Sequence, residues 1–177
     1  MLIFIPDAWK KQPAADVSHK QVATLEPNPD NLFLAEHARL LLDSYQRLIG
    51  KALAPVGDPP QRAKALYEAD FVVVSHDTAP DPVFNYANLA AQRLFGMDWD
   101  TFVALPSRLS AGPTHRDERQ RLLDAVTRNG YIDNYAGIRV AHSGRRFRVE
   151  AATVWNLTND AGNYAGQAAM FSEWHFL

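Results

Sequence analysis

The sequence predicts an α+β fold: a five-stranded antiparallel sheet with helices inserted between strands 2 and 3, plus an N-terminal amphipathic helix. Three observations predict it. Two runs rich in β-branched and aromatic residues, at 71–77 and 82–88, come before a helical stretch. Three more strand-like runs close the chain and are separated by short turn-forming segments. An apolar residue recurs every three or four positions between 34 and 52. In such an order, helices gather on one face of an antiparallel sheet.

Residues 1–30 are predicted to form an N-terminal arm. Four prolines interrupt this segment, and no apolar periodicity persists in it. The apolar run Leu2–Ile5 meets Pro6 and Asp7 too early for a signal peptide or a membrane-spanning helix. We therefore expect no membrane insertion and, since the chain has no cysteine, a reducing compartment such as the cytoplasm.

Residues 31–54 are predicted to form the amphipathic helix, continuous over 31–53. The helix is expected to begin after a cap at Asp30 or Asn31 and to end before Pro55. Its apolar stripe consists of Leu34, Ala38, Leu41, Tyr45, Leu48 and Ala52. This stripe could pack on the chain's own sheet or form a dimer seam. Because it is more apolar than a small sheet edge requires, we predict a homodimer through this helix and Leu2–Ile5.

Residues 61–177 are predicted to form the main domain, after a proline-rich linker. A short helix leads into the first strand. Asn88 is expected to cap the helix that follows the second strand, and Gly96 to end it. A short helix follows from "DWDTFVALP", and a longer one ends at Gly130, with Thr114 and Asp117 as its capping pair. Strands are expected at about 131–141, 146–157 and 164–175.

Composition excludes several classes of function. Eighteen basic and 20 acidic residues give a net charge of -2, so we expect no direct nucleic-acid partner. Without cysteine, disulfides, thiolate metal sites and cysteinyl-flavin chemistry are excluded. The six histidines are not spaced as metal ligands, and motifs such as GxSxG or a P-loop are absent, so we expect neither a metal site nor an enzyme. The cofactor is unknown: haem on His115 or His142, and a noncovalent flavin, stay open.

Several segments carry a family resemblance. "VFNYANLAAQRLFGM" resembles the second strand and following helix of PAS domains. "DPVFNYAN", "LPSRLSAGP", "DNYAGIRVAHSGRRFRVE", "VWNL" and "GQAAMFSEWHFL" are similar to the MEKHLA domain family, a PAS-related group found in small bacterial proteins and in certain plant homeodomain-leucine zipper regulators. The similarity covers about residues 33–177. It implies a PAS-like sensory or regulatory module and brings no catalytic residues with it.

The strand "RRFRVEAATVW" is expected to provide one wall of a binding cavity. Simple alternation places Arg146, Arg148 and Glu150 outside, as a solvated face. An anion site at these arginines is the alternative. The candidate ligand-binding residues are Asn85, Tyr86, Ala151, Thr153, Trp155, Ala168 and Met170, with Gln167 and Ala169 as the alternatives on the last strand. A slip of one residue would reverse every such assignment.

Two functional hypotheses follow. The first is a PAS-like sensory or regulatory module that binds a small, mostly apolar ligand and signals through its N-terminal helix. The alternative is a dimerisation or protein-interaction module without a ligand, its cavity packed shut. The expected partners are a small molecule and a second copy of the chain.

Overall fold

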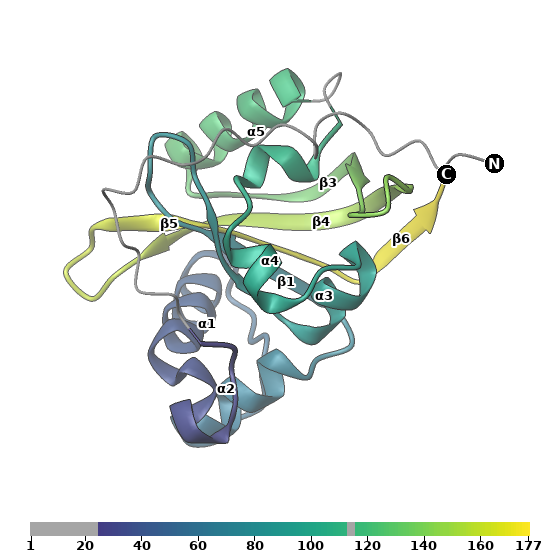
Figure 1. Ribbon diagram of the computed structural model, residues 1–177. Helices are drawn as coiled ribbons and strands as arrows, with labels where there is room; N and C mark the ends of the chain where they lie inside the picture. Colours follow the sequence, from purple (N-terminus) through teal and green to yellow (C-terminus); the bar gives the residue numbers. More distant parts are fainter. Residues whose placement is uncertain (1–24, 113–115) are drawn as a thin grey trace.

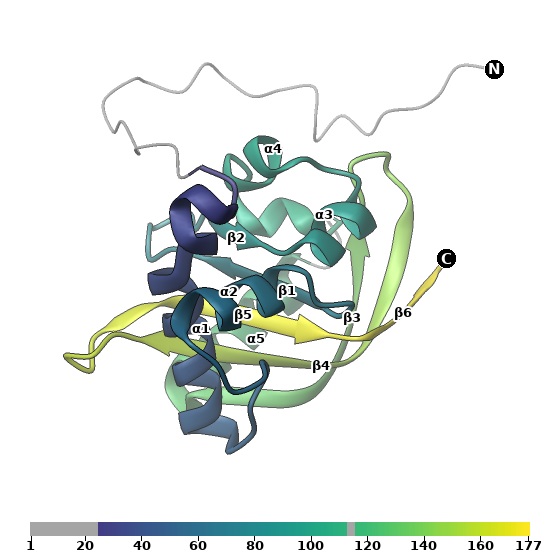
Figure 2. The ribbon, with the colours of Figure 1, turned by 90° about the horizontal axis from the view of Figure 1, so that it is seen from below.

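The computed structural model describes residues 25–112 and 116–177, and within them one antiparallel sheet. Its strands are β1 (Val72–His76), β2 (Phe84–Ala87), β3 (Tyr131–Val140), β4 (Arg146–Thr158), β5 (Tyr164–Phe171) and β6 (Glu173–Phe176). Their order is β2-β1-β5-β4-β3, and β6 pairs with β4 (Figures 1 and 2). The α+β class and the final antiparallel meander are confirmed.

The last predicted strand, 164–175, is two strands in the structure. Ser172 interrupts it, and β6 then continues along β4, so that Phe147 faces Phe176 and Val149 faces Trp174. The described residues therefore form six strands, where the sequence predicted five.

The helices between β2 and β3 follow the prediction closely. They are α3 (Leu89–Phe95), α4 (Trp99–Val103), the 3-10 turn η3 (Ser107–Ser110) and α5 (Arg116–Asn129). The Asn88 side chain accepts a hydrogen bond from the Ala91 amide, and Gly96 ends α3 at a φ of 65°. Gly130 ends α5 at a φ of 93°, where a β-carbon would be strained. The predicted cap at Thr114 lies outside the described residues.

The N-terminal helix is shorter than predicted. Helix α1 spans Ala35–Ile49, and a separate 3-10 turn, η2 (Pro29–Leu34), precedes it. The prediction of one continuous helix over 31–53 is wrong, because Leu32, Phe33 and Leu34 have φ values of 53°, 54° and 55°. Residues in this left-handed region cannot extend a right-handed helix. Asn28, rather than Asp30 or Asn31, caps the turn, and Gly50 ends α1.

Helices cover both faces of the sheet. Helices α1 and α2 (Pro59–Tyr67) lie on one face, which we call the α1 face, and α5 lies on the other, the cavity face (Figures 1 and 2). The apolar stripe of α1 packs on this sheet: Leu41 is 0% exposed and Tyr45 is 5% exposed. Of the two roles predicted for this stripe, packing on the chain's own sheet is therefore the one observed. The prediction that it forms a dimer seam is wrong, because its buried residues are covered within the chain.

A candidate ligand cavity between the sheet and α5

An irregularity in β4 decides which side chains face the cavity. Along β3, Tyr135 to Gly137 is two steps, but their partners on β4, Ala152 and Val149, are three steps apart. The extra residue is a β-bulge, and Ala151 within it is exposed and has a φ of 48°. The predicted alternation holds up to Val149 and reverses beyond Ala151.

Beyond the bulge, the residues of β4 face the opposite side of the sheet from the one that simple alternation predicts. Ala152 and Val154 line a cavity between the sheet and α5, together with Val149 from before the bulge. Thr153, Trp155 and Leu157 point to the α1 face, where Trp155 and Leu157 join the buried cluster under α1. Neighbouring residues of a single strand thus contact the cavity and the helix.

The cavity has a volume of about 60 Å³ and a mostly apolar wall. The aromatic and aliphatic side chains of this wall include Phe84, Phe95, Leu122, Leu123, Val149 and Val154. One water needs about 10–15 Å³ by this measure, so the space equals about four to six waters. Each water occupies about 30 Å³ in the liquid. A ligand that replaces this number of waters is therefore about as large as a single aromatic ring or a short aliphatic chain.

Two buried amides join the sheet to α5 at one end of the cavity. Asn156 Nδ2 donates to the carbonyl oxygens of Val126 (3.0 Å) and Thr127 (3.2 Å). Gln167 Nε2 donates to the Leu123 carbonyl at 3.0 Å, to Thr127 Oγ1 at 2.8 Å and to Asn156 Oδ1 at 3.1 Å. The end of α5 is therefore held to β4 and β5 by hydrogen bonds to these two side chains.

The same network fixes the orientation of the Gln167 amide. The Leu123 carbonyl can only accept, and the Thr127 hydroxyl already donates to it at 2.9 Å, so the amide nitrogen must face α5. Gln167 Oε1 is then left buried at the cavity wall, with no hydrogen-bond partner among the described residues. Gln167 Oε1 is thus a polar point on an otherwise mostly apolar wall.

A cation lies at another part of the cavity wall. Arg139 of β3 is half-buried, and its Nη2 donates to the Tyr135 hydroxyl at 3.3 Å. Gly137, between them, lets the Tyr135 ring lie along the strand, because a β-carbon there would be 2.1 Å from the Tyr135 hydroxyl oxygen. Gly137 therefore leaves room for the Tyr135–Arg139 pair.

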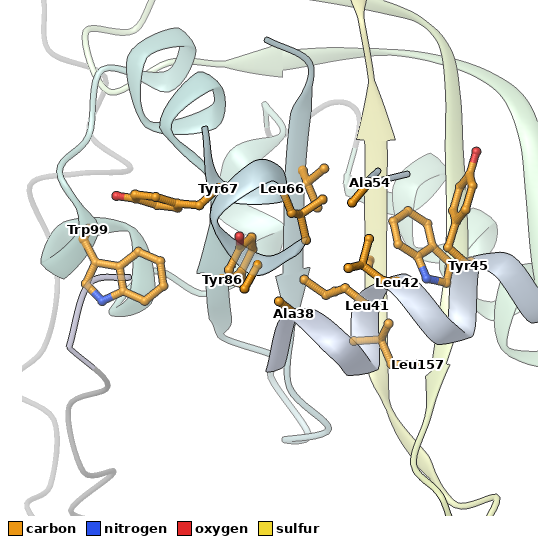
Figure 3. Close-up of a cluster of buried hydrophobic side chains, with 14 residues drawn as sticks. Ala38, Leu41, Leu42, Tyr45, Ala54, Leu66, Tyr67, Tyr86, Trp99 and Leu157 are labelled. Atoms are coloured by element: carbon orange, nitrogen blue, oxygen red, sulfur yellow. The ribbon is translucent and has the colours of Figure 1, made fainter. Parts of the chain in front are cut away.

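The α1 face is densely packed. Figure 3 shows Leu41, Leu42 and Tyr45 of α1 gathered with Leu157 of β4 in one cluster. The Tyr45 ring meets the Trp155 ring edge-on, with centroids 5.0 Å apart. At the end of the hairpin that joins β4 to β5, Arg39 forms two hydrogen bonds of 2.9 Å with Asp160. Helix α1 thus contacts β4 and the hairpin that follows it.

His37 anchors the beginning of α1. Its ring stacks on Tyr86 with centroids 5.5 Å apart, and its Nε2 lies 3.0 Å from Ser75 Oγ. Ser75 donates to Asn85 Oδ1 at 2.6 Å, so Nε2 of His37 is the donor to Ser75. Burial lowers the pKa of His37 to about 4 and keeps the ring neutral at pH 7.

Two polar atoms are buried under α1 without a partner among the described residues. They are the Tyr86 hydroxyl and the Trp155 indole nitrogen. An unsatisfied buried donor costs about 1–3 kcal/mol, which weakens the packing of α1 on the sheet.

The structure gathers most of the predicted site residues, on the face opposite the cavity. Tyr86 and Trp155 are in the cluster under α1, Met170 packs against it, and Thr153 pairs with Met170. Asn85 bonds to Ser75 at the same face, while Ala151 is exposed at the bulge. Ala168 packs in that cluster and also borders the cavity.

Sequence reasoning missed several residues that line the cavity. They are Val149, Ala152, Val154, Arg139, Tyr135 and Leu123. Gln167 and Ala169, the alternatives on the last strand, do line it. The pairing of small and β-branched residues at 152 and 154 was visible, but the bulge that turns them inward was not.

Other expectations concern metals and membranes. Within residues 25–112 and 116–177, the side chains that the structure describes include no group of three or more His, Asp or Glu placed to hold a metal ion. His142 is exposed in the turn after β3, and His115 lies outside the described residues. Within the same ranges, no helix has both the length and the apolar character needed to cross a membrane.

Solved structures with a similar fold are PAS and light-oxygen-voltage domains. A PAS domain from Colwellia psychrerythraea has a TM-score of 0.57 at 15% identity, covering 66% of this chain and 94% of that one. A light-oxygen-voltage domain studied with a flavin analogue has a TM-score of 0.53 at 18% identity, covering 65% and 83%. A variant of the fungal photoreceptor VVD has a TM-score of 0.54 at 14% identity, covering 75% and 93%. At these identities the likeness shows the fold alone.

Sequence comparison gives the family. No curated protein matches the chain closely enough to count as a relative. The family model of the MEKHLA domain matches residues 35–176, which include α1 and the whole sheet. With the PAS-like fold and this match over most of its length, the chain belongs to the MEKHLA domain family.

Proposed function

We propose that this chain is a sensory or regulatory module that binds a small, mostly apolar molecule in the cavity and signals through α1. One observation carries the proposal. Val154 lines the cavity, while the next residue, Trp155, is 0% exposed against Tyr45 of α1. A ligand that displaces β4 therefore acts on both faces of the sheet.

The packing of α1 supports a signalling role. A ligand shifts an equilibrium only when it favours one of two states that differ by a few kcal/mol. The unsatisfied Tyr86 hydroxyl and Trp155 nitrogen oppose docking of α1, and its apolar stripe favours docking. These opposing contributions reduce the free-energy difference between docked and loosened α1.

A flavin is not the ligand that fits this cavity. A flavin analogue was used with one of the domains of similar fold. Here the volume of about 60 Å³ suits one ring, and the three fused rings of a flavin need far more room. The sequence also has no cysteine to bond to a flavin. Haem is larger still than a flavin, so a cavity of this size does not favour it either.

Filling the cavity tests the binding proposal. Isothermal titration calorimetry with hexan-1-ol is expected to show binding to the wild type. Ala152→Leu places three more carbons into the cavity wall and is expected to abolish this binding. Ala161→Leu makes the same change at an exposed position in the β4–β5 hairpin and should leave binding intact. Circular dichroism confirms folding of both variants.

The same calorimetry distinguishes between the two functional hypotheses that the sequence suggests. A wild type that binds neither hexan-1-ol nor a six-carbon anion such as hexanoate would contradict the proposal and favour an interaction module without a ligand. Homodimerisation, a cytoplasmic location and the absence of catalysis remain parts of the proposal. Because the stripe of α1 is covered, a homodimer would have to use another surface.

A further inference from the structure

The surroundings of Arg139 differ from those of the other described basic side chains. Arg39, Arg62, Lys64, Arg108 and Arg148 each have a carboxylate within 4.0 Å. The described arginines without such a partner among the described side chains are Arg47, Arg93, Arg121, Arg128, Arg139, Arg145 and Arg146, and all except Arg139 are exposed. Arg139 is thus the half-buried one, and it lies on the cavity wall.

The neighbours of Arg139 leave part of its hydrogen-bonding capacity unused. Nη1 donates to the Ile138 carbonyl at 3.0 Å and Nη2 to the Tyr135 hydroxyl at 3.3 Å. A guanidinium has five N–H donors, so others remain for a ligand. The Tyr135 hydroxyl accepts from Arg139 and keeps its own proton to donate. A partly desolvated cation beside a free hydroxyl donor favours an anion.

We propose that the ligand is a small carboxylic acid with an apolar tail. This inference rests on the proposed function and names the ligand class of the same cavity. The carboxylate forms an ion pair with Arg139 and accepts a hydrogen bond from the Tyr135 hydroxyl. The tail lies along the apolar wall. A monoanion matches Arg139, the one arginine or lysine among the described residues of this wall, whereas a phosphate ester, with up to two charges, would leave charge unpaired in an apolar site.

Matched probes test the head group. At pH 7, calorimetry compares hexanoate, hexan-1-ol and hexyl phosphate, which share a six-carbon tail. Hexanoate is expected to bind the wild type at least about tenfold more tightly than hexan-1-ol, the usual gain from a charge-assisted hydrogen bond. Hexyl phosphate is expected to bind more weakly than hexanoate.

Variants assign the effect to the guanidinium. Arg139→Gln is expected to remove the advantage of hexanoate over hexan-1-ol, while Arg139→Lys retains part of it. Tyr135→Phe is expected to reduce it. Arg146→Gln, on the exposed end of β4, removes the same charge away from the cavity and should change nothing.

The outcomes keep the two proposals apart. If hexan-1-ol binds the wild type and hexanoate binds no more tightly, the acid is wrong and the cavity site is retained. If Arg139→Gln keeps the full preference for hexanoate, Arg139 is not the anion partner. If neither probe binds the wild type, the proposed function itself fails. If Arg139→Gln does not fold, the comparison of probes on the wild type still decides the ligand class.

Discussion

Individual residues on β4 and β5 link the two faces of the sheet. Val154 and Gln167 face the cavity, and their neighbours Trp155 and Ala168 pack under α1. Trp155 therefore packs against α1, whereas the sequence predicted that it lines the cavity. The sequence did identify the right strands, because aromatic and small residues alternate there.

His37 makes the stability of the protein depend on pH. Its pKa is lowered to about 4 by burial, against an ordinary value of 6.5. Between these values the unfolded chain binds a proton that the folded chain does not, so the free energy of unfolding falls as pH falls from 6.5 to 4. The shift corresponds to a loss of at most about 3 kcal/mol.

Urea denaturation at pH 7 and pH 4.5 measures this effect. The wild type is expected to lose stability over this range, and His37→Gln to lose less, although it starts lower because the contacts with Tyr86 and Ser75 change. Equal losses in the two proteins would show that His37 does not carry the pH dependence.

At the scale of elements, the bulge in β4 is what sequence reasoning could not supply. Strands, capped helices and the closing meander follow from residue patterns, and Asn88, Gly96 and Gly130 act as predicted. Ala151 has no property that marks it for a left-handed conformation, since glycine or asparagine usually occupies such a position. The conformation arises from the register in which β4 pairs with β3. No local feature of the sequence around Ala151 indicates that register. The same limit applies to Leu32–Leu34, where left-handed residues precede α1.

The bulge gives a direct prediction about stability. Ala151→Gly removes the β-carbon at a φ of 48° and is expected to raise the free energy of unfolding by about 0.5–1 kcal/mol. Ala152→Gly, the matched change at the next, buried position, is expected to lower it by about 1 kcal/mol. Urea denaturation measures both. A loss of stability in Ala151→Gly equal to that in Ala152→Gly would contradict the bulge.

At the scale of the whole molecule, one sheet separates a small cavity from a docked helix. Amide hydrogen bonds from Asn156 and Gln167 hold α5 over the cavity face, and Arg39 and Tyr45 attach α1 to the other face. Strands β4 and β5 both line the cavity and contribute to the cluster under α1. A ligand that spreads the cavity wall is therefore expected to strain the contacts of Trp155 and Leu157 with α1.

Hydrogen exchange tests this coupling most directly. With saturating hexan-1-ol, the amides of α1, residues 35–49, are expected to exchange several-fold faster relative to those of β1, and this change should be lost in Ala152→Leu. If the probe binds and the exchange of α1 changes only in step with that of β1, the cavity does not communicate with α1 and the account of signalling is contradicted.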